Sequence, residues 1–168
     1  MLDIRALRIE PGSVRRVEVP VALEPLVLGG QTYQPVPAET TAQVELQPTN
    51  GALYLKLGFA TALEGPCMRC LEPARLELEL ETSEYHDRAA AADGDDDLTC
   101  EYLEADDQLD VARWAHDTLV LEVPGRILCK PECAGLCPHC GARLEEGDGH
   151  QWVEAETDTR WEKLKDLL

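Results

Sequence analysis

Basic residues are scarce in this 168-residue chain: 15 lysines and arginines stand against 33 aspartates and glutamates, giving a formal net charge of −18. Proteins that bind nucleic acids in general depend on lysine and arginine to neutralise phosphates. The composition therefore argues against a general nucleic-acid-binding protein, and any contact with RNA would need a local basic patch or an intermediary. It fits a protein with a basic partner, or one that is simply well solvated.

Long apolar runs are also missing. No stretch approaches the roughly 18 apolar residues that a membrane span requires, and the longest apolar-looking segment, Val19 to Gly30, is interrupted by two prolines and a glutamate. The first ten residues carry charges where a signal peptide would need an uninterrupted apolar stretch. We therefore expect a cytoplasmic protein that makes no membrane contact.

The motifs of common enzyme classes are absent as well. The sequence has no phosphate-cradling glycine loop, no HExxH helix and no GxSxG nucleophile elbow. A catalytic zinc ion keeps an open coordination position, and only Asp148 and His150 hint at one here. We expect a protein that is not an enzyme and has no small-molecule substrate, with a metal-dependent hydrolase as a weaker alternative.

What the first half of the chain does contain is alternation of apolar and polar residues with a period of two. This pattern is typical of antiparallel strands with one wet face. Turns are indicated at Gly29-Gly30 and at Asn50-Gly51. The sequence predicts an antiparallel β-meander whose strands centre on residues 17–21, 42–46, 53–59 and 76–80.

The second half should add a few helices. Residues 89–110 hold nine acidic side chains and no basic ones, which predicts a solvated insertion at about 89–108. Asp110 is a good N-cap for a helix at about 110–122, which must end before Pro124. The apolar face of that helix would consist of Val111, Trp114, Ala115 and Leu119.

The predicted fold class is α+β, an antiparallel β-meander with a few helices and a C-terminal zinc-binding module. Residues 1–124 would form the β-rich domain, and residues 125–168 would form a zinc-knuckle module that closes with a helix capped near Asp158. One side of this closing helix would carry Trp161, Leu164 and Leu168.

Seven cysteines are present, and an odd number in a reducing compartment argues against a disulfide framework. Six of them form three close pairs, in which two thiolates can point at one ion. Gly141, directly after the last pair, tolerates the backbone angles of a metal knuckle. Paired thiolates favour zinc, one or two ions, with an iron–sulfur cluster as the alternative. We call Cys67 and Cys70 the first pair, Cys129 and Cys133 the second pair, and Cys137 and Cys140 the third pair.

Two ligand schemes are open. In one, the second and third pairs surround a single ion, which leaves the first pair without a role. In the other, the first and second pairs share an ion and so staple the end of the β-meander to the C-terminal module. The third pair would then bind a second ion together with Asp148 and His150. We prefer the second scheme because it leaves no close pair idle.

The remaining cysteine and histidines are not expected to bind metal. Cys100 stands alone in an expected strand, Leu98 to Leu103, and an isolated cysteine usually packs as a small apolar group. His86 and His116 lack partners at metal spacing and should be surface or core residues. His139 would be strained as a third ligand within one knuckle.

A C-x-x-C pair can also carry out redox chemistry, as in thioredoxin-like enzymes, where the first cysteine begins a helix after a strand. The first pair instead lies between two alternating stretches, with Gly65-Pro66 before it and Pro73 after it. That context predicts a hairpin tip. The alternative function in this class is a thiol-based redox-sensing zinc protein, in which oxidation ejects the metal.

Two blocks of the sequence, CMRCLEP at Cys67–Pro73 and LCKPECAGLCPHCG at Leu128–Gly141, resemble the YceD family. Its members are called large ribosomal RNA subunit accumulation proteins. Residues 109–124 resemble the helix of that family, and Asp158–Trp161 is similar to its closing Asp-Pro-Arg motif. The resemblance covers roughly residues 15–168. Where fuller members carry Asn-Leu-Asn and then Cys-x-Cys, this chain has Arg143-Leu144-Glu145 and then Asp148-Gly149-His150.

The resemblance implies a role in producing or stabilising large-subunit ribosomal RNA, that is, in ribosome biogenesis, without catalysis. Because of the charge of −18, we expect the protein to act through a basic ribosomal protein or a ribosome assembly factor, so that its contact with ribosomal RNA would be indirect. The acidic stretch at Asp95–Asp107 would be the contact surface. Three basic residues close to the cysteines could touch RNA phosphates: Arg126, Lys130 and Arg143.

Overall fold

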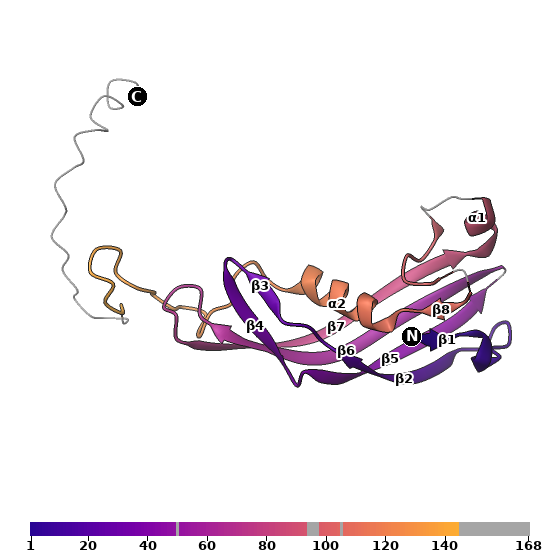
Figure 1. Cartoon of the computed structure of the whole chain (residues 1–168), viewed down its shortest axis with the longest axis horizontal. Coiled ribbons are helices and arrows are strands. Elements are labelled where there is room, and N and C mark those ends of the chain that lie inside the picture. The colour runs from indigo at the N-terminus through magenta and orange to yellow at the C-terminus, as the bar shows by residue number, and fades with distance from the viewer. Residues whose placement is uncertain (50, 94–97, 105, 145–168) are drawn as a thin grey trace, which may run out of the picture.

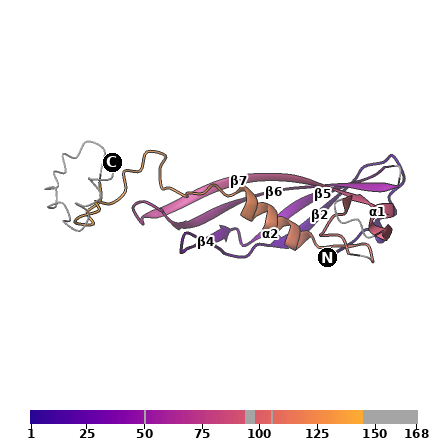
Figure 2. The same ribbon diagram turned by 90° about the horizontal axis from the view of Figure 1, so that it is seen from above.

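The computed structural model describes residues 1–49, 51–93, 98–104 and 106–144, and shows an elongated molecule built on one long, twisted antiparallel sheet (Figure 1). A helix lies against one face of this sheet (Figure 2). None of the helices in the described ranges is long and apolar enough to cross a lipid bilayer. The β-rich α+β class predicted from the sequence is therefore confirmed.

The strands of the sheet are β2 (Arg15–Ala22), β3 (Leu26–Leu28), β4 (Gln31–Val36), β5 (Glu39–Thr49), β6 (Ala52–Pro66) and β7 (Pro73–Asp87). A separate small ladder joins β1 (Leu2–Asp3) to β8 (Gln108–Leu109). The helical segments are η1 (Arg5–Leu7), α1 (Arg88–Asp93) and α2 (Val111–Glu122).

Strand β6 is the central element of the sheet. It pairs with β7 along its whole length, whereas its opposite edge pairs first with β5, over Ala52–Gly58, and then with β4, over Ala62–Glu64. Strand β2 pairs with β5, and β3 pairs with β4. The four predicted strands correspond to β2, β5, β6 and β7, and these pair one after another, so the predicted meander order is confirmed for them. The sequence did not predict the β3–β4 hairpin, which lies between β2 and β5 in the chain and pairs with the far half of β6.

The turns predicted from glycine are confirmed. Gly29 and Gly30 have φ angles of 57° and 79° and connect β3 to β4. Gly51, with a φ angle of 94°, lies in the connection between β5 and β6, where Thr49 pairs with Ala52. Such positive angles cost glycine little and cost other residues more.

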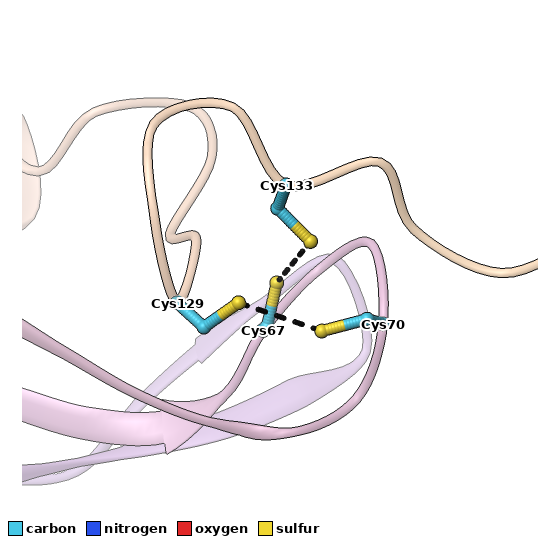
Figure 3. Close-up of side chains that lie close together, drawn as sticks. All are labelled: Cys67, Cys70, Cys129 and Cys133. Atoms are coloured by element: carbon cyan, nitrogen blue, oxygen red, sulfur yellow. Dashed lines mark hydrogen bonds between the residues drawn. The ribbon is translucent and has the colours of Figure 1, made fainter. Parts of the chain in front are cut away.

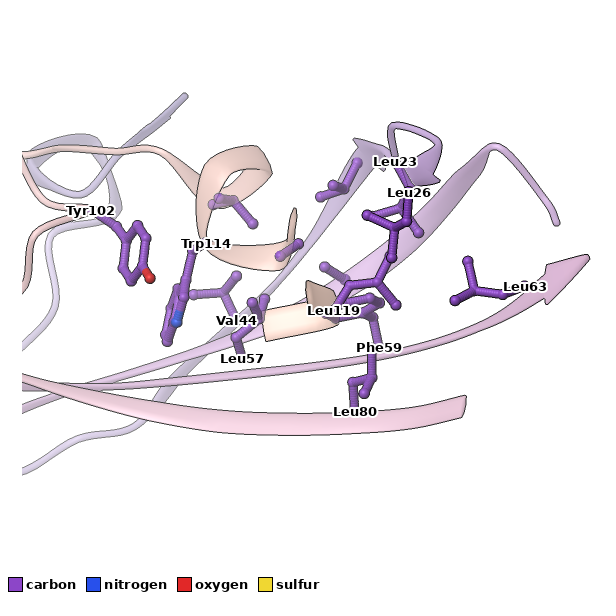
Figure 4. Close-up of a cluster of buried hydrophobic side chains, with 14 of the residues drawn as sticks. Leu23, Leu26, Val44, Leu57, Phe59, Leu63, Leu80, Tyr102, Trp114 and Leu119 are labelled. Atoms are coloured by element: carbon purple, nitrogen blue, oxygen red, sulfur yellow. The ribbon is translucent and has the colours of Figure 1, made fainter. Parts of the chain in front are cut away.

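The core lies between the inner face of the sheet and α2 (Figure 4). The alternating side chains of β6 predicted to be apolar are buried there, among them Leu57 and Phe59. Trp114 and Leu119 reach them from α2, and the Tyr102 ring stacks on Trp114 with 5.8 Å between the ring centroids. This packing removes the apolar stripes of both elements from water.

Helix α2 begins and ends where the sequence predicts. The Asp110 carboxylate accepts a hydrogen bond from the Arg113 backbone N–H at 3.0 Å, which satisfies one of the free amides of the first turn. Val123 is already extended, as expected of a residue before Pro124. The buried face contains the four predicted residues and Thr118.

The acidic insertion is more structured than predicted. Its beginning forms α1, and its end packs on the core, because Cys100, Tyr102 and Leu103 are buried. The expected strand from Leu98 to Leu103 is wrong, since Leu103 makes only an isolated bridge, to Leu109. The few apolar side chains between the acidic ones anchor this segment.

Some predicted features belong to the part of the chain that the structure does not describe. The predicted closing helix near Asp158 lies outside the described residues, and so do the predicted metal ligands Asp148 and His150. The proposed domain boundary after residue 124 stays a prediction. Ile127 and Cys133 nevertheless belong to the same core cluster as the sheet, so the segment after α2 packs against the β-rich part.

Candidate metal centre

The first cysteine pair lies at the tip of the β6–β7 hairpin. The last rung of the ladder pairs Pro66 with Pro73, and neither proline can donate a further ladder hydrogen bond. Beyond that rung the Cys67 N–H donates to the Glu72 carbonyl at 2.7 Å, and the Leu71 N–H donates to the Cys67 carbonyl at 2.9 Å. The prediction of a hairpin tip is confirmed, and the tight turn directs both thiols to one side (Figure 3).

The second pair is brought to the same place by the segment that follows α2. This segment runs back to the hairpin tip, where the buried Ile127 accepts a hydrogen bond from the Met68 N–H at 2.9 Å. The Arg69 guanidinium donates to the Cys133 carbonyl at 2.7 Å. These two contacts fix the loop that carries Cys129 and Cys133 over the tip.

The four sulfur atoms of the first and second pairs form one compact group, all within 4.8 Å of one another. Cys67 Sγ lies 3.7 Å from Cys133 Sγ, and Cys70 Sγ lies 3.5 Å from Cys129 Sγ. Four thiolates about 2.3 Å from a tetrahedral zinc ion would lie roughly 3.8 Å apart. The observed spacing fits such an ion, and the sulfur-only donor set suits a closed structural site.

Backbone amides point at two of the sulfurs. The Arg69 N–H donates to Cys67 Sγ at 3.4 Å, and the Gly135 N–H bonds to Cys133 Sγ in the same position, two residues after its cysteine. Such bonds stabilise thiolates and orient metal ligands. Burial alone raises the pKa of the Cys67 thiol, but bonds from the backbone of Arg69, Cys129 and Cys70 together lower it to about 6.

The two thiols of the second pair respond in the opposite direction. The neighbouring Cys70 side chain, and then burial, raise the pKa of Cys129 to about 12. Burial, and then Cys70, raise the pKa of Cys133. Four negative sulfurs this close together repel one another unless a cation lies between them. The group is therefore suited to exchange its protons for a metal ion.

Tyr33 in β4 supports the hairpin just before the first cysteine. Its side chain is fully buried, and its hydroxyl donates to the Pro66 carbonyl at 2.7 Å. Gly65 allows this approach, because a Cβ atom there would lie 2.5 Å from Tyr33 Cδ1. The residue pattern around the cysteines did not reveal this contact, although a glycine within a strand often marks such a close approach.

The third pair forms the same kind of turn as the first. The Cys137 N–H donates to the Ala142 carbonyl at 2.7 Å, and the Gly141 N–H donates to the Cys137 carbonyl at 2.9 Å. Gly141 has a φ angle of 71°, and Leu71 at the equivalent position of the first pair has 64°. Aligning the two C-x-x-C pairs would have flagged Leu71 from sequence.

The third pair does not belong to the four-sulfur group within the described part of the chain. The scheme in which the second and third pairs share one ion is therefore not the arrangement of the structure. The scheme that joins the first and second pairs matches it. A second ion at Cys137, Cys140, Asp148 and His150 stays a prediction.

The residues not expected to bind metal lie elsewhere. Cys100 is buried in the core, and burial raises the pKa of its thiol to about 11. Its backbone N–H donates to His86 Nδ1 at 3.3 Å, and burial lowers the pKa of that histidine. His116 is half-buried on α2. These positions agree with the predicted packing roles.

Comparison with known proteins places these features in a family. The family model described as "Large ribosomal RNA subunit accumulation protein YceD" matches residues 55–168, which include most of β6, all of β7 and α2, and all three cysteine pairs. The chain belongs to the YceD family. The family match thus includes both segments that contribute to the four-sulfur group, the β6–β7 hairpin tip and the segment after α2.

Individual relatives of this YceD-family chain are of two kinds. An uncharacterized protein of Mycobacterium tuberculosis is 34% identical over 107 residues, covering 62% of this chain and 50% of that protein. A chloroplastic protein of Zea mays, named a homolog of the large ribosomal RNA subunit accumulation protein, is 29% identical over 144 residues, covering 69% of this chain and 48% of that protein. The chain spans about half the length of these relatives. No solved structure matches it.

Proposed function

We propose that this protein is a non-enzymatic zinc-binding factor that promotes the accumulation of large-subunit ribosomal RNA in the cytoplasm. The observation that carries the zinc proposal is the group of four sulfur atoms within 4.8 Å, drawn from the hairpin tip and from the segment after α2. The role in RNA accumulation is supported by membership of the YceD family and by the name of the maize relative.

The zinc ion would be structural. Four thiolates leave no coordination position open for substrate, and three of the four cysteines are buried. Its binding free energy would add directly to the stability of the folded state, by about 10 kcal/mol or more in small thiolate-rich sites. The ion would hold the segment after α2 on the hairpin tip.

The partner would be basic. A net charge of −18 makes direct and general contact with RNA phosphates unfavourable, and it favours a lysine- and arginine-rich ribosomal protein or assembly factor. The protein would then raise the amount of large-subunit RNA by stabilising an assembly intermediate that contains this partner.

Replacing Cys133 with serine tests the metal site. We expect the Cys133→Ser variant to lose one zinc ion per chain, as measured by elemental analysis, and to melt well below the wild type. Cys100→Ala is the matched control, because it removes a buried thiol outside the site; it should keep its zinc and lose only about 1 kcal/mol of unfolding free energy.

Three results would contradict the zinc proposal: no metal in the wild type, iron in place of zinc, or full zinc content in the Cys133→Ser variant. Elemental analysis of the wild type also separates one ion from two, and Cys137→Ser reports on the predicted second ion. Mild peroxide distinguishes the redox alternative, since a closed structural site should retain its zinc and a sensor should release it.

The cellular role is tested by complementation. In cells that lack the protein, the ratio of large- to small-subunit ribosomal RNA should fall, and the wild-type gene should restore it. An unchanged ratio in the deletion strain would overturn the proposed role even if zinc is present.

A further inference from the structure

Strand β7 leaves one edge of the sheet open. It pairs with β6 over all 15 of its residues, and within the described ranges no other strand pairs with it. No backbone hydrogen bond from elsewhere in the described chain reaches its outer edge. Figures 1 and 2 show β7 as the outermost strand on the side away from β2. Such an edge presents a row of unpaired N–H and C=O groups to a further strand.

The opposite edge of the sheet is protected in a way that β7 is not. Strand β2 has only eight residues, and Pro20 interrupts its hydrogen-bonding row. In β7 no proline follows Pro73. The far end of β7 is covered, because the segment at Cys100 packs on His86. The open stretch is therefore residues 75–82.

The open stretch has two chemically different faces. On the outer face, away from α2, the exposed Glu77, Glu79 and Glu81 form a row of carboxylates. Glu77 pairs with Arg75 at 2.6 Å and Glu81 pairs with Lys56 at 2.8 Å, but within the described chain Glu79 forms no ion pair. The row therefore keeps negative charge that a cation could neutralise.

On the inner face, Leu76 and Leu78 are only half-buried, although they pack against the core. The leucine nearest the middle of the strand, Leu80, is buried. A strand added beside β7 would cover the two partly exposed leucines with its own apolar side chains. Its alternate side chains would lie beside the glutamates.

We propose that the edge of β7 at residues 75–82 binds an extended, basic segment of a partner protein, which joins the sheet as an additional strand. Main-chain hydrogen bonds supply affinity in this mode, and alternate side chains supply specificity. Lysine or arginine beside Glu79 and valine-like residues beside Leu76 and Leu78 would match both faces. This inference rests on the proposed function, because it gives the chemistry of the basic partner proposed there.

A second copy of this chain fits the edge poorly. Pairing two β7 edges would bring two rows of glutamates onto one face, and like charges on adjacent strands are destabilising. A nucleic acid fits poorly for the same electrostatic reason. The charge of the edge thus selects a basic protein segment.

The test uses the zinc-loaded full chain, labelled with ¹⁵N, and an octapeptide that alternates valine with lysine or arginine. We expect backbone amide resonances of residues 75–82 to shift, and alternate amides there to exchange with solvent at least tenfold more slowly. Raising the salt concentration from 0.1 M to 0.5 M should weaken binding severalfold. An octapeptide that alternates valine with glutamate should not bind.

Two variants locate the site. Glu79→Lys reverses the unpaired charge, and Leu78→Lys puts a charge on the inner face, a device that natural edge strands use to prevent pairing. Each should weaken binding at least tenfold. Glu18→Lys is the matched control, because Glu18 lies on the same outer face and on the same rung as Glu81 but at the β2 edge; it should leave the affinity within twofold.

The proposal is overturned if the peptide does not bind, if the shifts map to another surface, or if Glu18→Lys weakens binding as much as Glu79→Lys. It is also overturned if the protein dimerises through β7 in sedimentation, or if an RNA oligonucleotide, and not the peptide, shifts the β7 resonances. None of these results changes the zinc content or the large-subunit RNA ratio, so failure here is distinct from failure of the proposed function.

Discussion

Leu71 occupies a backbone conformation that usually belongs to glycine. Its φ angle is 64°, and Gly141 at the equivalent position of the third cysteine pair has 71°. The Leu71 side chain is 57% exposed, so it gains little from packing in return for this conformation. A left-handed conformation in a residue other than glycine costs of order 1 kcal/mol or more. The turn that holds the first cysteine pair therefore forms against a local backbone preference.

Substitution of Leu71 tests this interpretation. Leu71→Gly should keep full metal content and change the unfolding free energy by less than about 1 kcal/mol, because relief of strain offsets the added flexibility of the unfolded chain. Leu71→Val should lower it by roughly 1–2 kcal/mol, because a β-branched residue tolerates positive φ poorly. Thermal unfolding of the zinc-loaded variants measures both. If Leu71→Gly lowered the unfolding free energy and Leu71→Val left it unchanged, the interpretation that the Leu71 backbone is strained would be contradicted.

At the scale of single residues, the sequence was informative about the cysteines and silent about their surroundings. Close spacing marked Cys67 and Cys70 as neighbours of one another, because only a short turn separates them. Spacing could not reveal that Arg69 would donate to the Cys133 carbonyl or that the Tyr33 hydroxyl would donate to the Pro66 carbonyl. The first contact joins residues that are 64 positions apart in the sequence, and the second joins residues that are 33 positions apart.

The end of β6 shows how one strand prepares the site. Gly65 accepts the ring of Tyr33 at a distance that no Cβ atom would allow, whereas a Cβ on Gly58 in the same strand would meet nothing closer than the Leu80 carbonyl oxygen at 3.8 Å. The two glycines therefore differ in purpose. Gly65 makes room for a buried ring, and Gly58 does not.

Alanine at each of these glycines should separate the two roles. Gly65→Ala should lower the unfolding free energy by about 1–3 kcal/mol, since the Tyr33 ring must move and its bond to Pro66 is disturbed. Gly58→Ala should change it by less than about 1 kcal/mol in either direction. Urea unfolding of both zinc-loaded variants gives the comparison, and equal effects would contradict the packing argument.

At the scale of elements, local patterns predicted the helix, the four strands β2, β5, β6 and β7 and their order in the sheet, but not the β3–β4 hairpin. Asp110 and Pro124 carry the start and stop signals of α2 within the sequence itself. Alternation in β6 says which side chains face the core, but it carries no information on how far each neighbouring strand extends, so it did not show that β5 ends at Gly58 and that β4 pairs with the second half of β6. The prediction of a strand at Leu98–Leu103 was wrong because three apolar residues that anchor a loop on the core give the same sequence pattern as a short strand.

At the scale of the whole molecule, the four-sulfur group closes a long loop. Cys70 and Cys129 are 59 positions apart, and β7 and α2 both lie between them. Cross-linking a loop of this length lowers the entropy of the unfolded chain enough to stabilise the fold by about 4 kcal/mol in the chain-entropy model. A bound ion would therefore act on elements that do not touch it.

Cutting this loop exposes the effect. With a protease site inserted between Asp93 and Leu98, the two cleaved fragments should remain associated through the core, and urea should separate them. Removing zinc with a strong chelator should lower the urea concentration needed, because the ion is then no longer a second connection between the fragments. The uncut protein with and without chelator is the control. Identical urea midpoints for the cut protein, with and without zinc, would show that the ion does not join the fragments.

The length of β6 sets a distance between the two ends of the protein. Fifteen extended residues span about 45 Å, with the cysteines beyond one end of the strand and the N-terminal β1–β8 ladder near the other (Figure 1). Structural changes confined to one end should therefore leave the other end unperturbed, and their free-energy effects should simply add. Two molecules bound at opposite ends of the protein would therefore be kept apart by roughly this distance.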